Sequence, residues 1–381
     1  MKVLISGASI AGPTLAHWLA LSGHQVTVVE RATALRPGGH AVDLRGPALE
    51  VITRMGLMDK CRAIETDTLY NECVDQRGKR FGRMKRGFGV IDPTDVEVMR
   101  GDLAQLLYEH TRDVADYRFG DHVLAIDGHD VAFASGRCES FDVIVGADGV
   151  HSRTRTLMFP GSELRHMGMA MAVFTVPDML GIPRGQLVYN GVGKIGSIKS
   201  CGDQLKVVVF FRHAPGESID LTTVADIYRN EGWVWPQICD AIDEADFYSD
   251  ITCQIRGPIA RDHVALVGDA GYCPSPLSGQ GTSLAIAGAY CLAAELAGSV
   301  DVGAALARYE QRMLPFVRLN QDAALNIAKG AAPTSKTGLW MRNFMMRTLP
   351  YTPWAGLVMK LAMRGIRKAA HSLELPKYQL A

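Results

Sequence analysis

Residues 261–284, RDHVALVGDAGYCPSPLSGQGTSL, decide the fold of this chain. The apolar run 264–267 ends at Gly268-Asp269, which predicts a buried strand with a carboxylate at its C-terminal end. A loop with two prolines follows, and Gly279-Gln280-Gly281 opens into a predicted helix over 282–297. The first N–H groups of a helix are free and its dipole is positive there, so such a start suits an anionic or electron-rich ligand. An acid and a helix start so close in the chain favour a cofactor with many oxygen atoms.

The first thirty residues contain a second nucleotide-binding pattern. A predicted strand over 2–6 leads through GASIAG at 7–12 into a predicted helix over 13–22, and a strand over 25–29 ends at Glu30. In this strand–turn–helix–strand unit the turn holds a pyrophosphate and the acid binds ribose hydroxyls. Ser9 replaces the middle glycine, which weakens the pattern, but the distance from Gly12 to Glu30 is near the roughly 20 residues expected.

Two other interpretations of the N-terminal unit are weaker. Its glycines could serve packing alone, without a phosphate ligand. A hydrolase nucleophile elbow at Ser9 fails because Gly12 comes one residue too late for the G-x-S-x-G spacing.

A third motif lies in the middle of the chain, FDVIVGADGVHS at 141–152. An apolar strand again runs into a turn of Gly and Asp, here containing Asp148 and followed by Arg153 and Arg155. Alone it is a strand with a turn. As the second of three strand-end motifs in this order, it indicates a shared ligand.

The order GASIAG, GADGVHSRTR, GDAGYCPSPLSGQG resembles that of the FAD-dependent single-component aromatic hydroxylases, the p-hydroxybenzoate-hydroxylase-like flavoprotein monooxygenases. The resemblance covers residues 1–319 and is greatest to short members, such as the tetracycline-inactivating monooxygenases. It implies an α/β fold: a Rossmann-like FAD-binding lobe, an interleaved antiparallel β-sheet substrate lobe and a C-terminal helix.

Domain boundaries follow from the same pattern. We expect the FAD-binding domain at 1–68, 96–165 and 253–330, the substrate-binding sheet at 69–95 and 166–252, and a C-terminal helical segment at 331–381. A hairpin is predicted from strands at 69–74 and 79–84, which flank Asp75-Gln76-Arg77-Gly78.

The resemblance and the local chemistry assign the cofactor contacts alike. Glu30 binds the adenosine ribose, Asp269 binds the ribityl or pyrophosphate region, and the Arg100 guanidinium suits a phosphate or ribityl oxygen. The pyrophosphate turn and the residues at the flavin ring are Gly7, Ser9, Ile10, Ala11 and Gly12, and Pro276, Gly279, Gln280, Gly281 and Thr282.

Five further residues are assigned less directly. Asp43 matches an acid near the flavin in the family, and Asp148 belongs to the middle motif. Arg31, Arg36 and Arg45 are candidates for adenine stacking or for a nicotinamide-nucleotide phosphate, with solvated arginines as the alternative. Cys273 could suggest a flavinylated cysteine, but a buried small apolar residue is the expected state.

The family chemistry implies that NADPH or NADH reduces FAD, that O2 adds at flavin C4a, and that the hydroperoxide transfers one oxygen to an electron-rich aromatic or polycyclic molecule. The flavin carries this chemistry, so no separate catalytic residue and no metal site is expected. The alternatives are a same-fold FAD-dependent reductase or dehydrogenase, a halogenase, and a non-catalytic flavin- or ligand-binding protein.

Strands predicted over 169–176, 186–190 and 205–211 form the roof of the substrate site. Strand alternation directs Val207, Val209 and Phe211 to one side, and Val208 and Phe210 to the other. The residues expected at the substrate are Met171, Val173, Val188 and Phe211, together with Pro276.

One predicted helix, 222–245, follows the roof strands. It contains Trp233 and Trp235, whose spacing is similar to a halogenase signature but lacks its continuation. We therefore expect both tryptophans to pack at the interface between the lobes.

Bulk properties agree with this interpretation. The chain of 381 residues is long enough for two lobes, and its formal net charge of zero argues against a nucleic-acid partner. Eight cysteines without C-x-x-C pairs, and a first strand that begins at residue 2, favour a cytoplasmic protein without a signal peptide.

The C-terminal segment is rich in Trp, Met, Lys and Arg, and Glu374 is its one acid. We expect this segment to bridge the two lobes, with a membrane surface or a homodimer contact as the alternatives. The apolar run 283–300 carries Glu295 and is predicted to be a buried helix rather than a membrane span.

Overall fold

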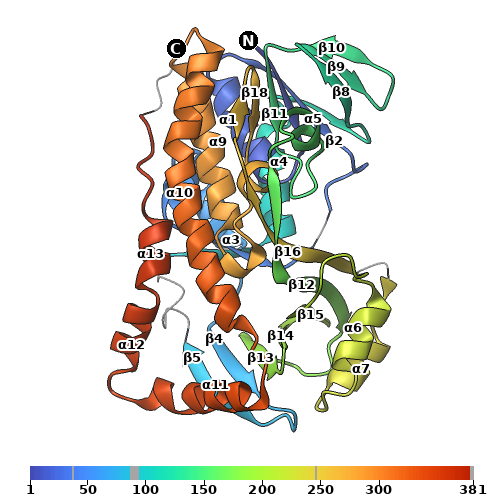
Figure 1. The fold of residues 1–381 in the computed structure, drawn as a ribbon, viewed down its shortest axis with the longest axis vertical. Coiled ribbons are helices and arrows are strands. Elements are labelled where there is room, and N and C mark those ends of the chain that lie inside the picture. The colour runs from blue at the N-terminus through green and yellow to red at the C-terminus, as the bar shows by residue number, and fades with distance from the viewer. Residues whose placement is uncertain (37, 86–93, 245–246, 378–381) are drawn as a thin grey trace.

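The computed structural model describes residues 1–36, 38–85, 94–244 and 247–377. It has the predicted α/β class, with a Rossmann-like lobe, an antiparallel sheet lobe and C-terminal helices (Figure 1). Five predicted ranges contain residues outside this description: 1–68 contains residue 37, 69–95 contains 86–93, 166–252 contains 245–246, the helix 222–245 ends on one of these, and 331–381 contains 378–381.

A six-stranded sheet forms the centre of the upper lobe, in the order β17-β18-β11-β1-β2-β7. All neighbouring pairs are parallel except β17 with β18. Parallel strands are buried on both faces, which explains their continuous apolar runs. The strands are β1 (Lys2–Ser6), β2 (Gln25–Glu30), β7 (Asp116–Phe119), β11 (Val143–Gly146), β17 (Ala260–Arg261) and β18 (Val264–Leu266).

Helices cover this sheet, and the two predicted ones have bounds within two residues of the prediction. The predicted helix 13–22 is α1 (Ala11–Leu21), and 282–297 is α9 (Gly281–Ala297), which is buried over almost its whole length. Both belong to one core with the sheet. The other helices of this lobe are α2 (Pro47–Arg54), α3 (Met58–Ala63), α4 (Arg100–Thr111), α5 (Arg153–Met158), α8 (Asp269–Tyr272) and the long α10 (Val302–Ala331).

Two small sheets complete the upper lobe. The strand β3 (Ala41–Leu44) pairs antiparallel with β6 (Val96–Met99), which brings Ala41, the register partner of Met99, beside the start of α4. A three-stranded meander follows β7 and was not predicted: β8 (Val123–Asp127), β9 (Asp130–Phe133) and β10 (Cys138–Ser140).

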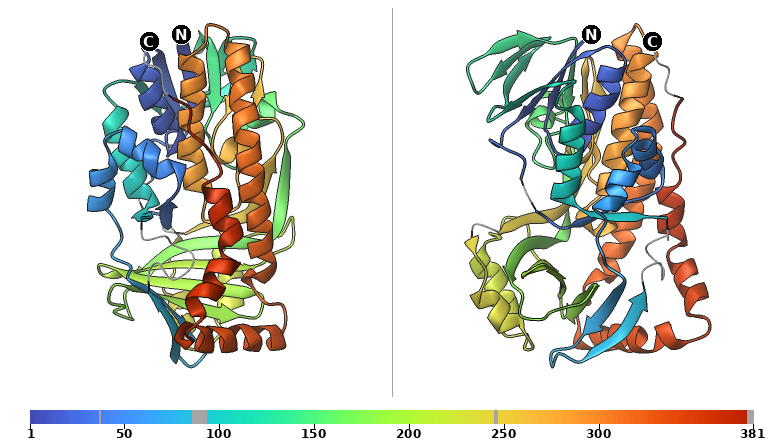
Figure 2. Two further views of the ribbon diagram at one scale, coloured as in Figure 1. Left: turned by 90° about the vertical axis from the view of Figure 1, so that its left-hand side faces the viewer. Right: turned by 180° about the vertical axis from the view of Figure 1, so that it is seen from behind.

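A seven-stranded sheet forms the lower lobe, in the order β16-β12-β15-β14-β13-β4-β5 (Figure 2). Its neighbours are antiparallel except β13 with β4. The predicted hairpin is present, whereas β14 was not predicted. The strands are β4 (Tyr70–Val74), β5 (Arg80–Lys85), β12 (Glu163–Pro177), β13 (Gly185–Gly191), β14 (Lys194–Cys201), β15 (Gln204–Arg212) and β16 (Tyr248–Arg256).

The long strands β12 and β16 connect the two lobes. Each runs through an expected domain boundary, at 165/166 and at 252/253, and they pair along most of their length. The two lobes therefore share continuous strands, which couples them mechanically.

The single helix predicted over 222–245 is wrong. The structure has α6 (Leu221–Tyr228) and α7 (Trp235–Asp240), separated by Gly232 and Trp233, whose φ angles of 73° and 48° break a right-handed helix. Trp235 is fully buried against Tyr189 and Tyr228 in the core between α6, α7 and the sheet, so the prediction that it packs at the lobe interface is also wrong.

The chain ends in α11 (Lys336–Thr348), the short 3-10 helix η3 (Leu349–Tyr351), α12 (Ala355–Ala362) and α13 (Arg364–Ala370). The helix α11 lies across the far end of the lower lobe, and α12 and α13 return along α10 toward the upper lobe (Figures 1 and 2). Among the described residues, each helix is too short or too polar to cross a bilayer.

Candidate cofactor and substrate site

The turn after β1 is packed so closely that only glycine fits at two positions. A Cβ at Gly7, whose φ is +115°, would lie 2.3 Å from the Ala147 carbonyl oxygen of the middle motif. A Cβ at Gly12 would lie 1.9 Å from the Gly7 carbonyl oxygen. Contacts below 3 Å to backbone atoms cannot be relieved by side-chain movement. The start of α1 is therefore held directly against the ends of β1 and β11, as a dinucleotide turn requires.

The Glu30 carboxylate closes the other side of this turn. It accepts hydrogen bonds from the backbone N–H groups of Ala8 and Ala32, each at 3.0 Å. Arg100, the first residue of α4, donates from Nη2 to Ser9 Oγ at 2.9 Å. The hydroxyl at the middle glycine position thus connects the turn to the predicted phosphate-binding arginine.

The starts of three helices converge beside the turn. A Cβ on Gly268, just before α8, would lie 3.3 Å from the Cβ atoms of Ala11 in α1 and Ala285 in α9. A Cβ on Gly281, the first residue of α9, would lie 3.5 Å from Asp269 Oδ1. Because helix starts present free N–H groups, this convergence forms a site for a polyanionic, oxygen-rich ligand.

Burial raises the pKa of Asp269, and the nearby Arg100 opposes that shift. Burial also lowers the pKa of His40 to about 4, with Arg100 acting in the same direction. The His40 ring is therefore neutral near pH 7, and Arg100 supplies the positive charge at this end of the site.

Arg45 lies in a buried ion-pair cluster. Its guanidinium is 2.6 Å from an Asp43 oxygen and 3.2 Å from an Asp95 oxygen, and the residue is 5% exposed. Ser283 of α9 accepts a hydrogen bond from the Arg45 N–H and donates to the Asp43 carbonyl. The cluster fixes β3 to the start of α9, and a carboxylate oxygen of Asp43 lies 4.0 Å from where a Cβ on Gly279 would be. Arg45 is thus a buried structural cation and not a solvated arginine, and its contact with a nucleotide stays a prediction.

The remaining predicted cofactor residues divide into three groups. Ile10 is buried at the start of α1, and Thr282 is half-buried in the first turn of α9. Arg31 and Arg36 are exposed beyond β2, and Pro276 is exposed in the 3-10 turn η2 (Pro276–Ser278). Cys273 is buried, as expected, with its thiol directed at the Cys253 carbonyl.

Asp148 has a structural role that was not predicted. Its carboxylate accepts from the Ser152 hydroxyl, from the N–H groups of Arg153 and Thr154, and from the Thr154 hydroxyl. These bonds cap the start of α5. These bonds engage both oxygens, so Asp148 is a helix-capping residue in this structure, and its contact with the cofactor stays a prediction.

Gln280 provides a test of whether the site fits FAD. The residue is 2% exposed, yet neither side-chain amide atom has a hydrogen-bond partner within the described part of the chain. A buried amide without partners is costly. FAD presents polar ring edges and a hydroxylated chain, which supply the missing donors and acceptors, so the residues present fit this cofactor.

The seven-stranded sheet separates the predicted substrate residues into two sets. The pairs Met171–Phe210 and Val173–Val208 lie on one face, as do the residues in register with them, including Val188. Phe211 points to the opposite face and is 1% exposed in the core under α6 and α7. The prediction of substrate contact for Phe211 is therefore wrong, because the odd-numbered residues of β15 face the helices. Phe210, the register partner of Met171, lies on the face of Met171 and Val173 instead.

Two residues that hold the site together were not predicted. Arg155 donates to the Ala270 carbonyl at 2.9 Å and to the Val150 carbonyl at 2.6 Å, which ties the middle motif to the third. Ser283 connects α9 to β3 as described above. The arginine after the middle motif was a visible signal; the serine has no distinguishing pattern.

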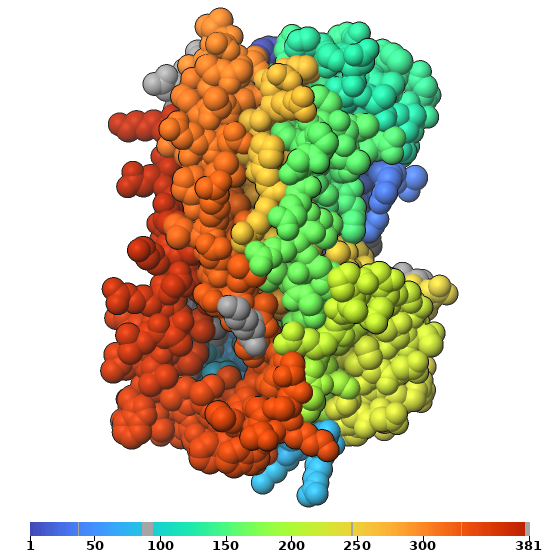
Figure 3. All heavy atoms as spheres, in the orientation of Figure 1, coloured from blue at the N-terminus to red at the C-terminus, as the bar shows by residue number. Residues whose placement is uncertain are grey.

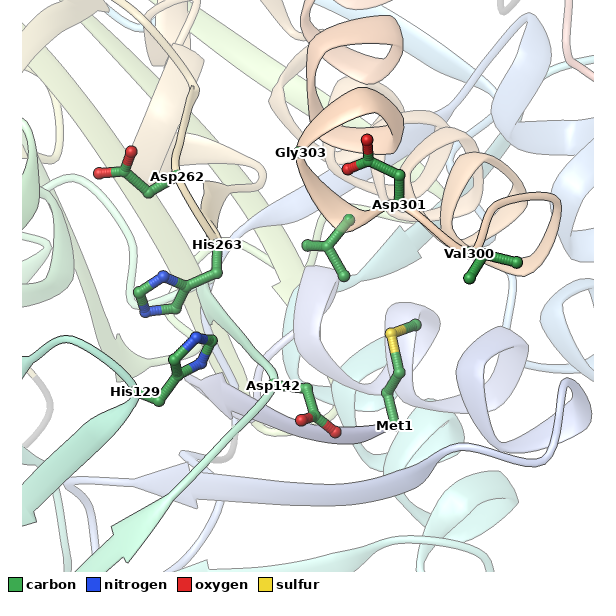
Figure 4. A pocket seen from close by; sticks show the side chains of 9 residues that line it. Met1, His129, Asp142, Asp262, His263, Val300, Asp301 and Gly303 are labelled. Atoms are coloured by element: carbon green, nitrogen blue, oxygen red, sulfur yellow. The ribbon is translucent and has the colours of Figure 1, made fainter.

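A hollow of about 720 Å³ lies at the opposite edge of the six-stranded sheet (Figure 4). Its stacked rings of His129 and His263 each hydrogen-bond a backbone carbonyl, and Asp142 accepts from the Lys2 N–H. It lies at the amino ends of β1, β11 and β18, whereas nucleotides bind at the carboxyl ends of parallel strands. The polar groups named here are already engaged, so this hollow is not the cofactor site.

The fold and the three motifs define the class: an FAD-dependent oxidoreductase with a separate sheet over its nucleotide site. A family model described as an FAD binding domain matches residues 1–324. A curated flavin-dependent monooxygenase from an unknown prokaryotic organism is 35% identical over 99% of both chains, and one from Legionella longbeachae is 31% identical over 100% of this chain and 98% of its own.

A solved structure agrees. The crystal structure of the tetracycline destructase Tet(55) is 33% identical to this chain, covers 99% of it and 98% of its own chain, and superposes with a TM-score of 0.84. The chain belongs to the FAD-binding-domain family of flavin-dependent monooxygenases.

Proposed function

We propose that this monooxygenase takes electrons from NADPH or NADH and inserts one oxygen atom of O2 into an electron-rich aromatic or polycyclic hydrophobic molecule. The observation that carries the proposal is the convergence of three helix starts with Arg100 and Asp269, in a chain whose second sheet carries an apolar patch on the face turned away from α6 and α7. We call this face the uncovered face. Bound FAD supplies the redox chemistry and the activation of O2.

The chain's own residues would hold the cofactor. Gly7, Ser9 and Gly12 receive the pyrophosphate, Glu30 the ribose, and Arg100 and Asp269 the connecting chain. The start of α9, with Gln280, meets the polar edge of the ring. Residues 1–68, 96–165 and 253–330 form the cofactor unit in this proposal, and 69–95 and 166–252 form the substrate unit.

The substrate class rests on the uncovered sheet face. Met171 and Val173 are buried, and Val188, Val208 and Phe210 are half-buried, so the face has an apolar patch. Polar residues in register with it, including Ser197, Asn190 and Lys199, lie on the same face. Such a face suits a flat hydrophobic ligand. The structural relative named as a tetracycline destructase supports a polycyclic aromatic substrate.

All eight cysteines are free thiols, which supports a reducing compartment and hence a cytoplasmic location.

The test is oxygen consumption and NAD(P)H oxidation by the FAD-loaded protein over a panel of phenols, quinones and tetracyclines, with products weighed by mass spectrometry. The expected result is a product heavier by one oxygen atom, labelled from ¹⁸O2 and formed with one NAD(P)H per turnover. NAD(P)H oxidation without O2 uptake would indicate a reductase, and a halide requirement with externally supplied reduced flavin would indicate a halogenase. FAD binding without turnover of any compound would indicate a non-catalytic flavin- or ligand-binding protein.

A further inference from the structure

Exposed apolar side chains gather on α11, η3 and α12. Trp340 is 66% exposed, Tyr351 71%, Trp354 59%, Leu357 61% and Leu361 60%. Elsewhere in the described residues, large exposed apolar side chains are scattered over separate elements. Isolated exposed apolar residues need no explanation, but a contiguous group indicates a surface that contacts something.

The spacing places these residues on continuous stripes. On α11, Trp340, Met341, Phe344 and Met345 follow the i, i+1, i+4, i+5 pattern of one helix face, and the rings of Trp340 and Phe344 stack at 5.5 Å. On α12, Leu357, Val358 and Leu361 repeat the arrangement. We name these residues, together with Tyr351 and Trp354, the apolar ridge.

The ridge is held outward by contacts on the opposite side of the same helices. Arg347 pairs with Asp75 at 3.3 Å and lies over the Phe81 ring, while a Cβ on Gly82 would touch the Met346 carbonyl oxygen. Farther along, Asn320 donates to the Ala369 carbonyl at 3.2 Å, which ties α13 to α10. These contacts fasten α11 to the lower lobe and α13 to α10, on either side of α12. The C-terminal helices form part of the molecular surface (Figure 3).

All charged side chains on the helices that carry the ridge are positive. Residues 336–370 contain no acid, although the chain as a whole has a formal net charge of zero. Lys360, Arg364 and Lys368 are exposed, and no ion pair to them is found within the described ranges. Apolar and aromatic residues beside unpaired cations are typical of helices that lie in the interface of an anionic bilayer.

We propose that the apolar ridge, with Lys360, Arg364 and Lys368, binds reversibly to the surface of an anionic lipid bilayer. The ridge inserts its aromatic and aliphatic side chains among the headgroups, and the cations meet lipid phosphates. A second copy of the chain is a poorer occupant, because a two-fold contact through this surface would bring like charges together.

The experiment is flotation of the full-length FAD-loaded protein with unilamellar vesicles, either of phosphatidylcholine alone or with phosphatidylglycerol added. The expected result is at least tenfold stronger partitioning into the anionic vesicles, weakened by salt. Trp354→Ser with Leu357→Ser and Leu361→Ser should lower partitioning at least tenfold into both vesicle types. Lys360→Gln with Arg364→Gln and Lys368→Gln should remove the preference for anionic lipid.

Two matched controls sit on distant exposed positions of the upper lobe. Leu21→Ser with Val114→Ser and Val300→Ser removes apolar side chains, and Lys60→Gln with Arg62→Gln and Arg137→Gln removes cations; both should bind vesicles as the wild type does. FAD content and melting temperature verify that every variant is folded.

The proposal is overturned if the folded wild type stays unbound at excess anionic lipid, or if the controls lose binding as much as the ridge variants do. Sedimentation velocity tests the other occupant, a second copy of the chain, by measuring whether the protein dimerises. A dimer that dissociates in the ridge triple variant, with no vesicle binding, would assign the surface to a second copy and reject the membrane.

Discussion

The two large sheets build their parts of the site in opposite ways. The six-stranded parallel sheet contributes through its backbone: glycines at 7, 12 and 268 let helix starts approach strand ends within van der Waals contact. The seven-stranded, largely antiparallel sheet contributes through side chains, and β12 and β15 direct alternate residues to the uncovered face and to the core under α6 and α7. The glycine positions of the parallel sheet leave almost no room for an added atom. In the second sheet, we expect side-chain substitutions to be tolerated on the uncovered face and to be destabilising on the face under α6 and α7.

The largest expected effect comes from adding one methyl group to the backbone-built site. In Gly12→Ala the new Cβ would lie 1.9 Å from the Gly7 carbonyl oxygen, so α1 must move away from β1. We expect FAD content after purification to fall more than tenfold. The control is Gly161→Ala, where nothing lies within 4 Å of the new Cβ. Normal FAD content in Gly12→Ala would contradict the backbone argument.

Next in size is a loss of packing on the helix-covered face of the second sheet. Trp235 is fully buried, and its indole nitrogen has no hydrogen-bond partner among the residues that the structure describes, so Trp235→Ala mainly removes packing. We expect about 3–5 kcal/mol of destabilisation in chemical denaturation. Trp340→Ala, at 66% exposure, should change stability by less than about 0.5 kcal/mol. Equal effects in the two variants would show that Trp235 is not a core residue.

A third effect depends on pH and belongs to the nucleotide side. The pKa of His40 is about 4 in the folded protein against 6.5 in an unfolded chain, so the unfolded state binds the proton more readily between those values. Stability should therefore fall by about 3 kcal/mol as the pH falls from 6.5 to 4, and should not respond to this group above 6.5. In His40→Gln this part of the pH dependence should disappear, as measured by urea denaturation from pH 4.5 to 7.5. The exposed His371→Gln should retain it; an unchanged slope in His40→Gln would refute the assignment.

The smallest effects compare two adjacent phenylalanines. Phe211→Leu alters the helix-covered core and should cost about 1 kcal/mol with little change in KM. Phe210→Leu alters the uncovered face and should raise the KM of a turnover substrate by up to about tenfold at nearly unchanged stability. Steady-state kinetics and denaturation of both variants test the face assignment, which is reversed if the two results are exchanged.

Much of this molecule could be predicted from local patterns. The strand 2–6 and the helix 282–297 were predicted to within one residue, because a buried strand or helix bounded by glycines has a clear local signature. The helix 222–245 was predicted wrongly, since Gly232 and Trp233 take left-handed φ angles that the apolar periodicity does not reveal. The meander after β7 was missed for another reason: its strands carry little apolar periodicity.

The amino-acid sequence by itself determined the nucleotide turn. The turn is built from residues close together in the chain, and its glycines are required by close backbone contacts, so their spacing is a local pattern. Only the tertiary structure decided that Asp148 caps α5 and that Arg45 is a buried, ion-paired residue. It also decided that Phe210, and not Phe211, lies on the uncovered face. Those roles depend on which distant residue completes a hydrogen bond, an ion pair or a strand register. Such partners are set by packing across the whole chain, and no local pattern contains them.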